Sequence, residues 1–70
     1  MKQGYLQHNS QGRYTIPGTY FTSGESIEIL VDGFWTKGRI EYSHKDEDYY
    51  FISEDGIEVH GLTGMQARAV

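Results

Sequence analysis

Acidic side chains are the most unevenly placed chemical groups in this chain. All ten Asp and Glu residues lie between Glu25 and Glu58, where only three basic residues offset them, so this stretch carries a net charge of −7. Its densest part is the run Asp46, Glu47 and Asp48. An acidic surface repels the phosphate backbone of nucleic acids and complements a basic protein surface. The charge distribution therefore favours a protein partner.

Aromatic side chains form the second informative set. The chain has six Tyr, three Phe and one Trp in 70 residues, more than so small a protein can bury fully at roughly 150–250 Å² each. We predict that Trp35, Tyr49 and Phe51 form an exposed patch. Lys37 and Arg39 share a strand face with Trp35 in the period-two pattern. Such a patch could bind a protein, stack nucleic-acid bases or enclose a methylated cation.

Other site chemistries find no support in the residue pattern. There is no cysteine, and the three histidines are scattered without further ligands at metal-binding spacing. The run Asp46–Asp48 lacks the glycine and the distal glutamate of a calcium loop. No serine lies in a nucleophile motif beside an oriented base. We therefore expect no metal, no cofactor and no enzymatic activity.

These side chains must be positioned by β-strands. Alternating β-prone runs predict an antiparallel meander through Ser26–Ser43 and Asp48–Ser53, with Asp32-Gly33 as a two-residue hairpin turn and His44–Asp48 as a longer loop. Shorter strands are predicted at 5–8, 13–16, 57–60 and 66–70, whereas 19–24 is expected to be a connection. The expected fold is a single all-β domain over residues 1–70, a five- to six-stranded SH3-like barrel.

The period-two pattern also predicts the core. In the second strand of the meander, Gly38 and Ile40 should face inward, because a small barrel bends sharply at such a glycine. The expected core consists of Ile27, Ile29, Val31, Ile40, Ile52, Leu62, Met65 and Ala67.

Two resemblances accompany this pattern. Trp35-Thr-Lys-Gly-Arg-Ile40 is similar to a central-strand pattern of SH3-like and Tudor-like barrels. Nearly the whole chain resembles a family of short bacterial proteins known as a domain of unknown function, from Gram-positive bacteria and their mobile elements. The matching stretches include Gly4–Asn9, Gly12–Ile16, Ser23–Leu30, Asp48–Ile52 and Leu62–Arg68. This resemblance implies no assigned activity and no catalytic residues.

The sequence thus predicts a non-enzymatic protein-binding module. The specific hypothesis is a mobile-element accessory or inhibitor protein whose acidic surface, with Asp46, Glu47 and Asp48, binds a nucleic-acid-handling host protein such as a defence nuclease. The alternative is direct nucleic-acid binding through the aromatic patch, and a methylated-cation cage is a third option. We expect a cytoplasmic protein, since no signal peptide or membrane span is evident, and either a monomer or a dimer.

Overall fold

The computed structural model describes residues 2–70 and contains nine β-strands. A six-stranded antiparallel sheet has the order β1-β9-β5-β6-β7-β8, and a three-stranded sheet has the order β2-β3-β4. The strands are β1 (Gln3–Tyr5), β2 (Gln7–His8), β3 (Tyr14–Ile16), β4 (Thr19–Phe21), β5 (Ser26–Val31), β6 (Phe34–Ser43), β7 (Asp48–Ser53), β8 (Glu58–Val59) and β9 (Gln66–Ala69).

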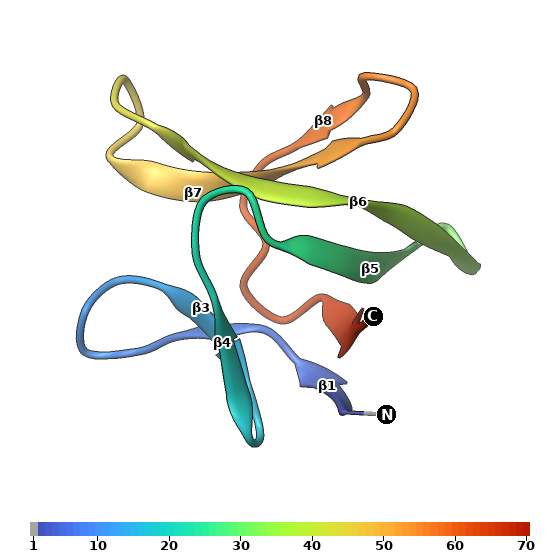
Figure 1. The fold of residues 1–70 in the computed structure, drawn as a ribbon, viewed down its shortest axis with the longest axis horizontal. Coiled ribbons are helices and arrows are strands. Elements are labelled where there is room, and N and C mark those ends of the chain that lie inside the picture. The colour runs from blue at the N-terminus through green and yellow to red at the C-terminus, as the bar shows by residue number, and fades with distance from the viewer. Residues whose placement is uncertain (1) are drawn as a thin grey trace.

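The larger sheet curls around the core without closing. In Figure 1 it runs from β8 at the top to β1 at the lower right, and the β3–β4 hairpin covers the lower left. Its end strands β1 and β8 do not pair with each other. The predicted all-β class is confirmed, but the predicted closed barrel is wrong. Residues 2–70 contain no helix that could cross a membrane.

The central meander follows the sequence pattern closely. Asp32 and Gly33 have φ angles of 50° and 84°, the positive values that a tight hairpin of matching twist requires. This turn fixes the β5–β6 register, in which Ile27 lies opposite Gly38 and Ile29 opposite Thr36. The register places the isoleucines of β5 and Ile40 of β6 on the same, inward face.

The observed core joins both sheets. Of the predicted core residues, Ile27, Ile29, Ile40, Leu62 and Ala67 are fully buried, while Val31 and Met65 pack against the core from its margin. The prediction that Ile52 belongs to the core is wrong. This residue lies opposite Arg39 and Glu58 on the outward face, because Phe51 takes the inward position on β7. The core also includes Leu6, Tyr14, Ile16, Phe21 and Phe51.

The N-terminal part differs most from expectation. The predicted strand 5–8 is interrupted at the buried Leu6, which separates β1 in one sheet from β2 in the other. Leu6 exchanges backbone hydrogen bonds with the segment before β9, donating to Met65 O and accepting from Gly64 N at 2.8 Å each. The segment 19–24 is partly a strand, β4, because Phe21 buries its ring opposite Tyr14.

Candidate binding surfaces

The acidic loop, His44–Asp48, connects β6 and β7 and presents its carboxylates differently. Glu47 is exposed and has a positive φ of 53°, a conformation that few non-glycine residues adopt. The backbone N–H of Asp46 donates to Ser43 Oγ at 3.2 Å, which braces the loop. Among residues 2–70, Glu47 makes no ion pair, so its carboxylate faces solvent.

Asp48 instead links the two sheets. Its Oδ1 lies 2.8 Å from His8 Nε2 on β2 and accepts the N–H of Tyr49 at 2.8 Å. Its Oδ2 accepts a longer bond of 3.4 Å from the hydroxyl of Tyr14, which in turn accepts the N–H of Leu62 at 3.2 Å. The His8 ring stacks on Tyr14 with centroids 4.2 Å apart. Asp48 is therefore a structural connector and only partly available to a partner.

Asp46 belongs to a cluster around His60. One ring nitrogen of His60 lies 3.2 Å from Asp46 Oδ2, and the other lies 3.0 Å from Glu58 Oε1. The His60 ring stacks on Tyr50, with centroids 4.8 Å apart and an interplanar angle of 8°. These contacts hold the end of β8 against the acidic loop. No sequence pattern indicates this contact, because residues 46 and 60 belong to different elements.

The outward face of the large sheet carries a mixed charge ladder. The Arg68 guanidinium lies over the Trp35 ring, 4.1 Å from its centroid, and Arg68 Nε donates to Glu28 at 2.8 Å. Arg39 Nε donates to Glu41 at 2.7 Å. Lys37 is exposed on this same face. Trp35, Lys37 and Arg39 therefore lie together as expected, but Trp35 is half-covered and the two arginines are paired with acids.

The predicted aromatic patch does not form. Phe51 is fully buried, because its ring fills the space that Gly38 leaves on the facing strand. Tyr49 also lies on the inward face, where it packs edge-on against Tyr42 with centroids 4.9 Å apart. Trp35 projects from the opposite face of the sheet. Our expectation that Phe51 is exposed is wrong, and the three rings cannot form one binding surface.

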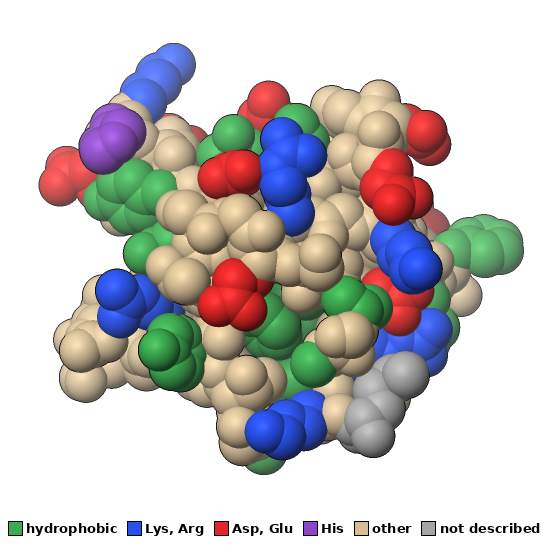
Figure 2. All heavy atoms as spheres, viewed as in Figure 1, with side chains coloured by type: hydrophobic (Ala, Val, Ile, Leu, Met, Phe, Trp, Pro, Cys, Tyr) green, Lys and Arg blue, Asp and Glu red, His purple; other side chains and the backbone are tan. Residues whose placement is uncertain are grey.

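On the face shown in Figure 2, acidic side chains do not form one continuous patch. Red acidic groups in its upper part alternate with blue basic ones, while its lowest part shows basic and apolar groups. Within residues 2–70, no three His, Cys, Asp or Glu side chains converge in a way that could hold a metal ion. Individual loops are therefore better candidates for contact than a whole acidic face.

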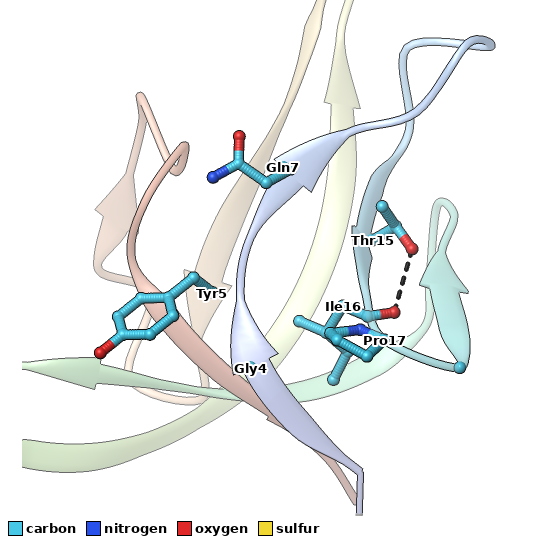
Figure 3. Close-up of a pocket in the computed structure, with 7 residues that line it drawn as sticks. Gly4, Tyr5, Gln7, Thr15, Ile16 and Pro17 are labelled. Carbon is cyan, nitrogen blue, oxygen red and sulfur yellow. Dashed lines mark hydrogen bonds between the residues drawn. The ribbon is translucent and has the colours of Figure 1, made fainter.

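One hollow lies away from these acids. A groove of ≈ 550 Å³ is lined on one side by Gly4, Tyr5 and Gln7 and on the other by the segment 15–18. Figure 3 shows Gly4 on the β1 ribbon, with the Tyr5 ring on one side and Pro17 on the other. Tyr5 is 61% exposed. The sequence analysis did not identify this site, since its two walls meet only through the contact of β1 with the β3–β4 turn.

Comparison with known proteins yields one match. A family model described as a domain of unknown function (DUF5348) matches residues 4–69. No curated protein and no solved structure matches this chain. The matched range includes the acidic loop and the residues that line the groove.

Proposed function

The chain belongs to the DUF5348 family of domains of unknown function, and we propose that it is a non-enzymatic protein-binding module. Its acidic loop contacts a basic surface on a partner protein, with Glu47 as the central contact. The more specific proposal is an accessory or inhibitor protein of a bacterial mobile element, located in the cytoplasm, that binds a nucleic-acid-handling host protein. We also propose that the fold is related to SH3-like barrels.

The conformation of Glu47 carries the argument. A left-handed backbone at a non-glycine residue costs about 1 kcal/mol or more, yet Glu47 makes no ion pair within residues 2–70 that would offset the cost. Ser43 and the Asp46–His60 contact hold the loop in place. A rigid loop that presents a solvated carboxylate needs little ordering on binding, which favours association.

The proposed partner follows from charge. Asp46 and Glu58 flank His60 beside Glu47, so several carboxylates lie near one end of the sheet. Complementary charges steer encounter and set orientation more than they add affinity. Proteins that handle nucleic acids display basic grooves for phosphate, and an acidic loop is suited to occupy such a groove.

A lysate pull-down with nuclease treatment tests this proposal. The variant Glu47→Lys should reduce capture of a basic protein by at least about tenfold, since loss of a close charge pair and the new repulsion together reach the level of about 1.4 kcal/mol. Asp55→Lys is the matched control, because Asp55 is an exposed acid in the turn at the other end of β7. Equal capture by wild type and Glu47→Lys would refute the loop as the contact.

Direct nucleic-acid binding is the alternative. Of the residues predicted to bind nucleic acid, only Trp35, Lys37 and Arg39 lie on one face of the sheet. Arg68 adds a further cation over the Trp35 ring. This alternative predicts that capture disappears with nuclease and that oligonucleotide affinity falls steeply with salt. Binding that survives nuclease and varies with residue 47 would favour the protein partner.

A further inference from the structure

The groove beside β1 has an unpaired strand edge as one wall. β1 is the last strand of its sheet, and within residues 2–70 it pairs only with β9. Lys2 O accepts Ala69 N–H at 2.9 Å, and Leu6 N–H donates to Met65 O at 2.8 Å. Backbone groups alternate in direction along an antiparallel strand. The N–H and C=O groups of Gln3 and Tyr5 therefore point away from β9, toward the open edge.

Pro17 explains why the neighbouring strand leaves this edge free. β2 pairs with β3 at Gln7–Thr15 and His8–Tyr14, and the same register would place Pro17 opposite Tyr5. Proline has no N–H to continue the ladder. The ring of Pro17 turns instead toward Gly4, where a Cβ atom would lie only 2.7 Å from Pro17 Cδ. The pairing ends there, and a groove opens between the two segments.

The charge around the groove differs from that of the acidic loop. Residues 2–24 contain Lys2 and Arg13 but no Asp or Glu. The Lys2 amine donates to Gly18 O at 2.9 Å, at the rim of the groove. In Figure 2 the lowest part of the molecule shows basic and apolar side chains, while acidic ones lie at its middle height and above. An occupant with negative charge is thus complementary.

We propose that this edge is a second binding site, which takes an extended acidic peptide segment of a partner protein as an added strand next to β1. The peptide backbone pairs with the free groups of Gln3 and Tyr5. An apolar side chain of the peptide enters the groove against Ile16 and Pro17. An acidic side chain two positions along the peptide, on the same face of the added strand, lies near Lys2. Strand addition of this kind takes affinity from backbone hydrogen bonds and specificity from pockets for alternate side chains.

The probe is a capped, fluorescein-labelled peptide in which valine and glutamate follow each other at every second position, with threonine between them, so that both face the groove. It is titrated into the full chain, and binding is measured by fluorescence anisotropy. Two matched probes separate the contribution of charge from that of backbone hydrogen bonds. In one, lysine replaces glutamate and reverses the charge. In the other, N-methylated valines lack their backbone donors. The glutamate peptide should bind, and both matched probes should bind at least about tenfold more weakly. Equal binding of the N-methylated probe would overturn strand addition.

A backbone variant tests the edge directly. Gln3→Pro removes an N–H that points away from β9, so the sheet should keep its pairing, whereas Gln3→Ala is the matched control that alters only the side chain. Peptide affinity should fall roughly threefold to tenfold in Gln3→Pro and be unchanged in Gln3→Ala. A thermal melt that matches wild type establishes that Gln3→Pro is folded. If Gln3→Pro unfolds, an NMR titration of the wild-type protein with the peptide decides whether the peptide binds at β1.

The amide NMR shifts from this titration locate the peptide independently. On titration, the largest changes should fall on Gln3, Tyr5, Gln7, Thr15 and Gly18. Changes centred on β4 or β8, which are edge strands away from the groove, would overturn the proposal. So would a concentration-dependent dimer in which these same amides shift without peptide, because a second copy would then be the occupant. Glu47→Lys should leave peptide binding unchanged, so failure here and failure of the acidic-loop contact are distinguishable.

Discussion

At the scale of single residues, neighbours in the sequence have unrelated roles. Asp46, Glu47 and Asp48 are indistinguishable by composition, yet one contacts His60, one faces solvent, and one joins the two sheets through His8 and Tyr14. The sequence predicted a site in this run because charge density is visible there. It could not assign the roles, because the partners of Asp46 and Asp48 are more than ten residues away.

Asp48→Asn should destabilise the fold, whereas Asp46→Asn should not. Asp48 lies at the junction of His8 and the buried Tyr14, and removing a charge-assisted hydrogen bond costs about 1.5–3 kcal/mol, less where solvent reaches the group. Within residues 2–70 the Asp46 carboxylate pairs only with the exposed His60, and the effect of Asp46→Asn should stay within about 0.5 kcal/mol. Urea unfolding of both variants measures the difference. Equal midpoints would show that Asp48 does not connect the sheets energetically.

At the scale of elements, the meander was predictable and the N-terminal strands were not. Asp32-Gly33 and the alternation of Ile27 and Ile29 specify a hairpin and its register locally. The break at Leu6 has no local signal, since it arises from hydrogen bonds to the segment before β9. For β7 the alternation alone does not determine which face is buried. The predicted assignment, with Ile52 inward and Phe51 outward, is reversed by the packing of Phe51 against Gly38.

Gly38→Ala tests that packing. An added Cβ would meet the Ile52 carbonyl oxygen and lie 2.6 Å from Phe51 Cζ. Both are fixed by the β6–β7 pairing, so the strand pair must shift, and overpacking of this kind typically costs about 1–3 kcal/mol. Chemical unfolding should show this loss of stability. Gly12→Ala is a poor comparison because its φ is positive, whereas Thr36→Ala on the same strand face is a suitable control. An unchanged midpoint for Gly38→Ala would contradict the close approach.

At the scale of the whole molecule, the two sheets share one core but leave strand edges open. A 70-residue chain buries only about 60% of the surface of its unfolded form, and this one does so with a curled sheet covered by a hairpin. The acidic loop lies beside His60 at the end of β8, and the β1 groove lies at the opposite end of the sheet order. The two proposed binding surfaces, the acidic loop and the groove beside β1, are thereby separated on one small domain.

Site-specific photo-cross-linking tests the central claim most directly. A photoreactive phenylalanine derivative replaces either Glu47 or Asp55, and each tagged protein is irradiated in nuclease-treated lysate of the source cell. We expect that residue 47 cross-links a defined basic protein and that residue 55 does not. Cross-linking of the same protein from both positions, or of no protein from residue 47, would contradict a contact through the acidic loop.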